Sequence, residues 1–233
     1  MSRSSDGPPD QKRYASSPCM AAEAGHYDPQ AVSPQQTADV ARWRKAERNR
    51  LRAERLALPV AIRQSVGEAL AGHLRELIRN RFSGANGRVI SFYWPIKGEP
   101  DLRPLMAEMH AQGAAIALPI VETKAAPLVF RLWTPDTQLV RGDWSIPVPP
   151  PSSPELIPGI VLAPLVGWAS GGFRLGYGGG YFDRTLAALL PRPYSIGIGL
   201  ESAQLPTIFP QPHDIPLDAI LTEGGERYAK VGA

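Results

Sequence analysis

The chain has 233 residues and a net charge of +3, and 43% of its residues are hydrophobic, which suits one globular domain of ordinary composition with an appendage. Its single cysteine, Cys19, excludes an intrachain disulfide framework and a cysteine-based zinc site. No apolar stretch approaches the roughly 18 residues needed to span a bilayer, and the N-terminus has no signal-peptide core. We therefore expect a cytoplasmic protein.

The start of the chain differs in composition from the rest. Residues 1–36 are rich in Ser, Pro, Gly, Gln and Asp, with only scattered apolar residues. Such a segment cannot bury enough apolar surface to offset the entropy lost on ordering. We predict a disordered extension over residues 1–36 and a single α/β domain over residues 37–233.

Two helices are predicted next. Residues 39–58 contain no Gly or Pro and many helix formers, which predicts a long polar helix. Between Arg42 and Arg55 this segment carries seven Lys or Arg residues against two Glu, which indicates a local anionic partner. Pro59 suits the first turn of a second helix. Its predicted apolar stripe is Ile62, Val66, Leu70, Leu74 and Leu77.

The remaining elements alternate between strands and helices. Strands are predicted at residues 88–94, 114–120, 127–133, 159–167, 194–200 and 218–222. Further helices are predicted at residues 101–113, with Leu102, Leu105, Met106 and Met109 on one face, and at residues 181–190. The run 159–167 is wholly apolar, as in strands buried on both faces of a parallel sheet. This order predicts an open, mostly parallel α/β sheet with helices on both faces.

The most distinctive stretch places four glycines within residues 176–180 and a helix directly after them. A buried strand, a glycine loop and a helix start together form an anion site, because backbone N–H groups and the helix dipole converge there. The loop lacks the Gly-Lys-Ser/Thr of a Walker motif, and Tyr181 occupies the third glycine position of the dinucleotide fingerprint. The residues alone leave a phosphate-binding loop and a tight turn without a ligand both open.

Two charged residues flank this loop. Asp183, in the first helical turn, fits a helix cap or a carboxylate beside Mg²⁺. Arg174 fits a surface ion pair or a bidentate phosphate clamp.

Five ordered segments resemble one known family, the 5-formyltetrahydrofolate cyclo-ligases. RLGYGGGYFDR is similar to that family's motif RLGxGxGYYDR. The other similar segments are RKAERNRLRAERLAL, YWPIKGEPDLRPL, WSIPVP and QLPTIFPQPHDIPLDAILTE, and the five together span residues 44–223. The resemblance implies a Rossmann-like fold and an enzyme that uses ATP and Mg²⁺. ATP phosphorylates the formyl oxygen of 5-formyltetrahydrofolate, N10 attacks the activated carbon, and phosphate leaves to give 5,10-methenyltetrahydrofolate.

The resemblance also implies roles for individual residues. Arg174 and Asp183 correspond to catalytic positions, and Asp183 and Asp214 to positions associated with Mg²⁺. The expected ATP and phosphate contacts are Arg44, Arg48, Arg55, Arg174, Leu175, Gly176, Tyr177, Gly178, Gly179, Gly180, Tyr181 and Phe182. The expected folate contacts are Trp94, Glu99, Trp144, Ile146, Tyr177 and Tyr181. The remaining basic residues of the helix, Arg42, Lys45, Arg50 and Arg52, are expected to form a solvated face.

Several expected roles have a physical basis and a structural alternative. Arg44, Arg48 and Arg55 lie within roughly 40° on one helix face, so they can meet one polyphosphate. The Glu99 carboxylate can accept two hydrogen bonds from a pterin edge, and Trp94 can stack on the ring. The alternatives are a solvated charged helix face, a turn glutamate and a core tryptophan. For Asp214 the alternative is a turn residue before a proline.

Two positions depart from the family's usual pattern. Trp168-Ala169 stands where Phe-Asp is usual, and Val148 where Glu or Gln is usual. Both departures remove polar groups on the folate side. Two other functions therefore remain open: a paralogue that binds nucleotide and a pterin-like anion without this activity, and an RNA-associated protein using the arginine-rich helix. The net charge of +3 is small for the RNA function. We expect small-molecule partners only, no membrane, and a monomer or weak dimer.

Overall fold

The computed structural model describes residues 34–230. Residues 1–33 of the predicted disordered extension lie outside the described part, so their disorder stays a prediction. For residues 34–36 the prediction is wrong, because they form the start of a helix that continues to Ala57. The chain divides into two compact units, residues 1–47 and 48–233, which are described separately. Within residues 34–230 no helix is long and apolar enough to cross a membrane.

The two predicted N-terminal helices are present. Helix α1 (Pro34–Ala57) is polar throughout and carries the basic cluster. Pro59 caps helix α2 (Val60–Phe82), as its fixed backbone geometry favours. The predicted stripe of α2 is buried from Val66 to Leu77, but Ile62 is 49% exposed because it stands in the first turn, ahead of the buried part of the helix.

A seven-stranded sheet forms the centre of the second unit, in the order β11-β10-β9-β6-β1-β2-β3. Its strands are β1 (Val89–Ser91), β2 (Ala115–Ile120), β3 (Val129–Trp133), β6 (Ile160–Pro164), β9 (Tyr194–Ile198), β10 (Ala219–Thr222) and β11 (Gly225–Ala229). The five central strands run parallel, and β3 and β11 close the two edges as antiparallel strands. The predicted mostly parallel sheet is therefore confirmed, while β11 was not predicted.

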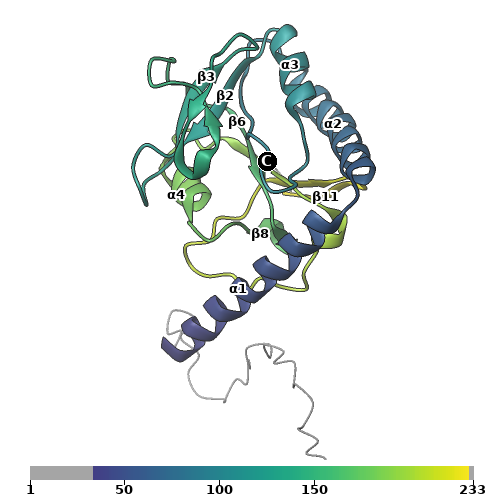
Figure 1. Cartoon of the computed structure of the whole chain (residues 1–233), viewed down its shortest axis with the longest axis vertical. Helices are drawn as coiled ribbons and strands as arrows, with labels where there is room; N and C mark the ends of the chain where they lie inside the picture. The colour runs from purple at the N-terminus through teal and green to yellow at the C-terminus, as the bar shows by residue number, and fades with distance from the viewer. Residues whose placement is uncertain (1–33, 231–233) are drawn as a thin grey trace, which may run out of the picture. The chain divides into compact units, whose positions relative to one another are not determined.

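Helices cover both faces of this sheet (Figure 1). Helix α3 (Arg103–Ala111) buries the predicted face of Leu105, Met106 and Met109, and its His110 ring contacts Trp133, which pairs with Ile116 of β2. Ala117 is the next residue of β2 and so points to the opposite face. There it packs with Phe130, Val161 and Phe182 of helix α4 (Tyr181–Ala188).

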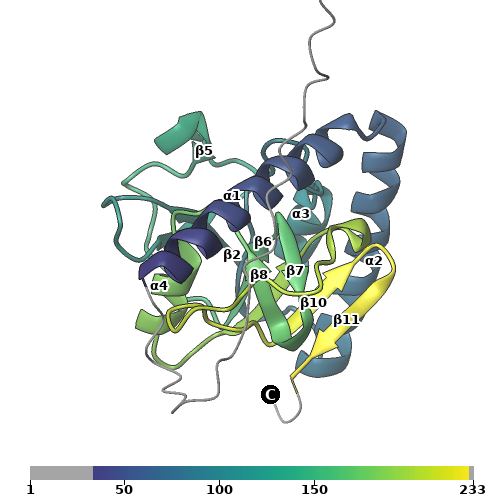
Figure 2. The same ribbon diagram turned by 90° about the horizontal axis from the view of Figure 1, so that it is seen from below.

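Two hairpins outside the sheet were not predicted. One joins β4 (Val140–Arg141) to β5 (Pro147–Val148) through the short 3₁₀ helix η1 (Asp143–Ser145). The other joins β7 (Gly167–Ala169) to β8 (Phe173–Leu175), and η2 (Ser170–Gly172) forms its turn (Figure 2). The glycine loop therefore follows a hairpin strand and not a strand of the parallel sheet, which corrects the predicted strand-loop-helix unit.

The strand order reverses between β1 and β6. From β1 the chain continues to β2 on one side, whereas from β6 it continues to β9 on the other. Ligands of open α/β proteins bind in the crevice outside the carboxyl ends of the strands at such a switch point. The segments that leave these two ends are residues 92–99 after β1 and residues 165–175 after β6.

Candidate active site

Arg55 joins the segments that meet at this switch point. Its side chain is buried, and its Nε donates to the carbonyl of Lys97, in the segment after β1, at 3.2 Å. Nη1 donates to the carbonyl of Leu165, directly after β6, at 3.1 Å. Nη2 donates to the hydroxyl of Tyr177 in the glycine loop at 2.6 Å. One guanidinium therefore fixes three segments that are far apart in sequence.

Glu99 is a buried acid beside the same loop. It is 6% exposed, and its Oε1 accepts the Tyr177 hydroxyl at 2.6 Å while Oε2 accepts the backbone N–H of Ile96 at 2.9 Å. Burial raises the pKa of Glu99, and the hydrogen bonds from Tyr177 and Ile96 and the charge of Arg55 oppose that shift. The structure thus brings together Glu99, Tyr177 and Arg55, three of the residues that the sequence singled out.

The glycine loop is held from both sides by arginines. Arg48 Nε donates to the Gly176 carbonyl at 2.7 Å, and Arg184 donates to the Gly179 carbonyl. Gly178 and Gly180 have φ values of 97° and 65°, a region that favours glycine. Gly176 has no such requirement, and no other atom lies within 4 Å of the point where its Cβ would stand.

Positive charge surrounds the Tyr177 ring. The guanidinium carbons of Arg52 and Arg55 lie 5.7 and 6.0 Å from the ring centroid, and Lys97 Nζ lies 5.6 Å from it. Arg52 was expected on the solvated face, and this is wrong, because it covers Tyr177 and its Nε is buried. Its spacing from Arg48 and Arg55, four and three residues, was the available signal.

The other basic positions of α1 differ from this cluster. Arg50 pairs with the exposed Glu54 at 2.8 Å, as a solvated face requires. Arg44, four residues before Arg48, belongs to the first unit, so its expected phosphate contact stays a prediction. Lys97 was not selected from the sequence, because only the fold brings the turn after β1 to the glycine loop.

Arg174 and Asp183 form a buried pair behind the loop. Arg174 Nη2 lies 2.7 Å from Asp183 Oδ1, and its Nη1 donates to the Ile215 carbonyl at 2.9 Å. Asp183 Oδ1 also accepts the N–H of Ile215 at 3.1 Å. Burial lowers the pKa of Arg174, and the charges of Asp183 and Asp214 oppose this. The pair joins the start of α4 to the turn around residue 215.

The aromatic residues expected to contact folate lie in two places. Trp144 is 66% exposed and its ring stands edge-on to Tyr181, with centroids 5.8 Å apart. Trp144 and the following Ser145 both have positive φ values, 54° and 59°, which is strained for non-glycine residues. Ile146 follows and is half-buried. Trp94 is half-buried, with the Arg103 guanidinium 5.2 Å from its ring.

The two departures from the family's pattern are both buried. Ala169 is 3% exposed on β7, and Val148 is 8% exposed on β5. Val148 fills the space beside Gly142, where an added Cβ would stand 2.9 Å from its side chain. These apolar residues therefore pack within the two hairpins that flank the loop and Trp144.

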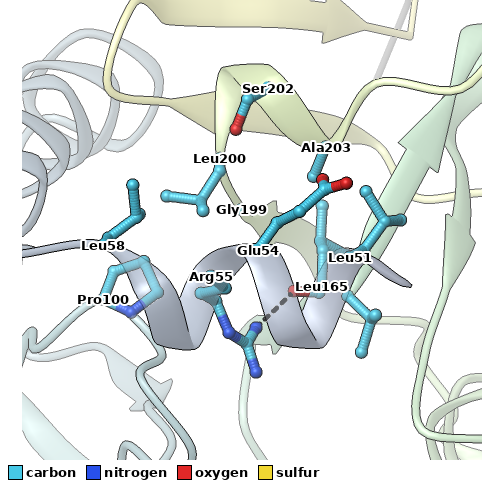
Figure 3. Close-up of a pocket in the computed structure, with 11 residues that line it drawn as sticks. Leu51, Glu54, Arg55, Leu58, Pro100, Leu165, Gly199, Leu200, Ser202 and Ala203 are labelled. Carbon is cyan, nitrogen blue, oxygen red and sulfur yellow. Dashed lines mark hydrogen bonds between the residues drawn. The ribbon is translucent and has the colours of Figure 1, made fainter. Parts of the chain in front are cut away.

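A small cavity adjoins Arg55 at the carboxyl ends of β6 and β9 (Figure 3). Its volume is about 160 Å³, which is smaller than the roughly 300 Å³ at which drug-sized ligand pockets begin. It is lined by Leu51, Glu54, Arg55, Leu58, Pro100, Leu165, Val166, Gly199, Leu200, Ser202 and Ala203. The sequence did not indicate it, because its wall comes from four separate segments.

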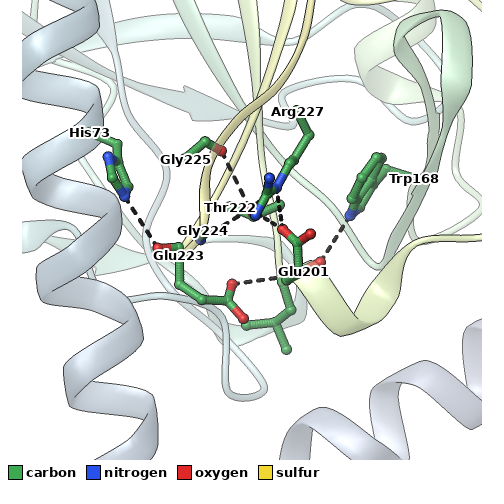
Figure 4. A network of polar contacts seen from close by, with 9 residues as sticks. His73, Trp168, Glu201, Thr222, Glu223, Gly224, Gly225 and Arg227 are labelled. Atoms are coloured by element: carbon green, nitrogen blue, oxygen red, sulfur yellow. Dashed lines mark hydrogen bonds and ion pairs between the residues drawn. The ribbon is translucent and has the colours of Figure 1, made fainter.

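One wall of the cavity is fixed by a polar network (Figure 4). Trp168 Nε1 donates to the Leu200 carbonyl at 2.8 Å, and the N–H of Glu201 donates to Glu223 Oε2 at 3.0 Å. The Thr222 hydroxyl donates to Glu201 Oε2 at 2.5 Å. The short helix η3 (Glu201–Ala203) is thus held against the end of β10 by these hydrogen bonds.

The residues present suit a polyphosphate better than an independent metal site. Arg48, Arg52, Arg55 and Lys97 converge on a loop with exposed backbone. Within residues 34–230, no group of three His, Cys, Asp or Glu side chains is placed to hold a metal ion. Asp214 Oδ2 accepts the N–H of Gln211 at 2.7 Å. Mg²⁺ commonly binds through one or two carboxylates together with substrate phosphates, and such a site forms only with the nucleotide.

The fold and this site define a doubly wound α/β protein in which basic side chains surround a glycine loop near the switch point. A profile of the 5-formyltetrahydrofolate cyclo-ligase family matches residues 40–223. The chain belongs to the 5-formyltetrahydrofolate cyclo-ligase family.

Individual relatives agree with this assignment. The 5-formyltetrahydrofolate cyclo-ligase of Mycolicibacterium smegmatis is 31% identical over 183 residues, 75% of this chain and 91% of that protein. The enzyme of the same name from Haemophilus influenzae is 26% identical over 185 residues, 76% of this chain and 96% of that protein. The solved structure of Aquifex aeolicus 5,10-methenyltetrahydrofolate synthetase is similar with a TM-score of 0.69, at 26% identity, over 82% of this chain and 94% of that chain.

Proposed function

We propose that this protein converts 5-formyltetrahydrofolate to 5,10-methenyltetrahydrofolate in an ATP- and Mg²⁺-dependent reaction that releases ADP and phosphate. The observation that carries the proposal is the contact of a buried acid, Glu99, with a glycine loop that basic side chains surround. The family match over residues 40–223 supports it independently.

On the phosphate side, ATP supplies the phosphoryl group that turns the formyl oxygen into a leaving group. Arg48, Arg52, Arg55 and Lys97 surround the loop with positive charge, so they neutralise the charge of the polyphosphate. The backbone N–H groups of the glycines approach the phosphates without side chains in between. This part of the chain contributes positioning and charge neutralisation.

On the folate side, Glu99 accepts paired N–H donors of the pterin and fixes the orientation of the ring. Its burial strengthens these hydrogen bonds, because the surrounding dielectric is low. Trp144 and Tyr181 provide an exposed aromatic corner beside the loop for the rest of the folate. These folate-side residues increase the reaction rate by orienting N10 toward the formyl carbon.

Asp183 and Asp214 are the carboxylates that would hold Mg²⁺ together with the ATP phosphates, where the ion would neutralise phosphate charge. Both carboxylates act on the charge of Arg174. Since Asp183 is already paired with Arg174 and Ile215, it also holds the loop in place.

The direct test is an absorbance assay of methenyl-folate formation with purified full-length protein, with ATP or Mg²⁺ omitted in turn. Turnover that requires the protein, ATP and Mg²⁺ supports the proposal. Binding of ATP and folate without turnover would support a paralogue without this activity. Tight RNA binding that falls steeply with salt, without turnover, would support the RNA-associated alternative. We also propose that the protein is cytoplasmic and a monomer or weak dimer.

A further inference from the structure

One tyrosine hydroxyl connects the two halves of the site. The Tyr177 hydroxyl donates to Glu99 Oε1 at 2.6 Å and accepts from Arg55 Nη2 at 2.6 Å. The proposed function assigns Glu99 to folate and Arg55 to the phosphates. The same oxygen atom is therefore bound to Glu99, which the folate uses, and to Arg55, which the phosphates use.

Both carboxylate oxygens of Glu99 already accept a hydrogen bond in this arrangement. Its Oε2 accepts Ile96, its Oε1 accepts Tyr177, and the residue is 6% exposed. A ligand donor that takes the position of the Tyr177 hydroxyl at Oε1 must therefore displace that hydroxyl, whereas Oε2 has a second lone pair that can accept a donor beside Ile96. The backbone N–H of Ile96 belongs to the turn itself, so Tyr177 is the partner that can leave.

Arg55 has a similar constraint at the nitrogen that faces Tyr177. Its Nε and Nη1 are bound to the backbone carbonyls of Lys97 and Leu165. Nη2 is the nitrogen whose partner is a side chain on a loop. A phosphate oxygen that binds the N–H of Nη2 now bonded to Tyr177 takes the place of the Tyr177 hydroxyl.

The backbone on both sides of Tyr177 has little steric restraint. Gly176 and Gly178 flank it, and glycine backbones change conformation at low steric cost. Tyr177 is 37% exposed, so its ring can leave its position without opening the core. The buried pair of Arg174 and Asp183 holds the far end of the loop in place.

We propose that Tyr177 couples the binding of the two ligands. Whichever ligand binds first breaks both hydrogen bonds of the hydroxyl, and this frees the group that the other ligand uses. The free energy needed to displace the Tyr177 hydroxyl is supplied by the first ligand, so the second ligand binds more tightly than it would alone. By linkage, the enhancement is the same in either order. This inference rests on the proposed function.

The test measures the dissociation constant of 5-formyltetrahydrofolate for the full-length protein, with and without a saturating non-hydrolysable ATP analogue and Mg²⁺. We expect the analogue to tighten folate binding about fivefold or more in the wild type, within the usual range of coupling between sites. In Tyr177→Phe this ratio should fall toward one, and each ligand alone should bind more tightly than to the wild type. Tyr194→Phe removes a hydroxyl at the start of β9, outside this network, and should keep the wild-type ratio.

The outcomes separate this inference from the proposed function. If both ligands bind the wild type independently, the coupling is wrong and the proposed function stands. If Tyr177→Phe retains the full wild-type ratio, the coupling exists but Tyr177 is not its cause, and the inference is overturned. If the wild type binds neither ligand, both fail. Independent binding of the two ligands to the wild type overturns the inference even if Tyr177→Phe loses stability.

Discussion

Arg174 and Asp183 stand on opposite sides of the glycine loop in the sequence and meet behind it as an ion pair of 2.7 Å, with side chains 4% and 19% exposed. The pair is bound on one side to both backbone groups of Ile215. It therefore fixes the loop relative to the turn that carries Asp214. Each residue is an expected catalytic position, and the geometry gives each a second task in positioning.

Removal of one residue of this pair should lower the stability of the protein. Asp183→Ala leaves the Arg174 charge buried without its carboxylate, so we expect a loss of about 3–5 kcal/mol in the free energy of unfolding. Glu108→Ala is the matched control, because its pair with Arg75 is also 2.7 Å long but exposed, and should cost at most about 1 kcal/mol. Chemical denaturation measures both. Equal small losses would show that the buried pair contributes no more than a surface pair.

The sequence predicted the sheet well because periodicity and apolar runs report burial directly. The run 159–167 and the face of Met106 and Met109 depend on local pattern alone, and both predictions were confirmed. Three short elements were missed, the β4–β5 hairpin, the β7–β8 hairpin and β11. They have two to five residues per strand, and they form through turns and partners that a local pattern does not encode.

The site was predicted in part, for a related reason. Glu99, Arg55 and Tyr177 were found through the family's motifs, and the fold places them in one hydrogen-bonded chain. Lys97 and the cavity beside Arg55 depend on the reversal of strand order between β1 and β6, which brings separate segments together. Spacing along the chain does not contain that information.

Glu99→Gln should impair folate use far more than nucleotide use. The amide cannot accept two hydrogen bonds with a full negative charge, so we expect kcat/KM for folate to fall by about 2–3 kcal/mol in transition-state stabilisation. The KM for ATP should change little. Steady-state kinetics with each substrate varied in turn measures this. An equal loss for both substrates would place Glu99 outside the folate side.

The buried Glu99 also makes a prediction about pH. Its pKa is raised from the usual 4.5, so the folded protein holds this proton to higher pH than the unfolded chain does. The free energy of unfolding should therefore fall as the pH rises from about 4.5 through the raised pKa of Glu99, and then level off. The difference between the wild type and Glu99→Gln should show this decline, since the variant lacks the group.

A matched control distinguishes the effect of Glu99 on the pH dependence of stability from that of an exposed carboxyl group. Glu68→Gln changes an exposed glutamate of α2 in the same way. A difference for Glu99→Gln that rises with pH, or that follows the Glu68→Gln curve, would contradict the account of a buried acid with a raised pKa.

The strained backbone at Trp144 should prove functional. Trp144→Gly relieves a left-handed conformation worth about 1–2 kcal/mol and loses an edge-on contact with Tyr181 worth about 0.5–1.5 kcal/mol. Stability should therefore change little, while the KM for folate rises severalfold. Ser145→Gly, with φ of 59° in the wild type, relieves similar strain without loss of the ring and should keep the KM. A destabilised Trp144→Gly with normal kinetics would make the tryptophan structural.

The glycine loop needs a probe that does not disturb its backbone. Gly178, at φ of 97°, is a poor one, because alanine there is strained whether or not a phosphate binds. Gly176 has no positive φ and no atom within 4 Å of its missing Cβ. The same is true of Gly159, before β6 and outside the loop, which makes Gly159→Ala the matched control.

The most direct measurement of the central claim is therefore kcat/KM for ATP of Gly176→Ala in the methenyl-folate assay, together with its melting temperature. A phosphate-binding loop predicts a loss of at least about tenfold, or roughly 1.4 kcal/mol, with the melting temperature unchanged. Gly159→Ala should match the wild type in both. Full ATP-dependent turnover in Gly176→Ala would contradict the claim that phosphates approach the backbone of this loop.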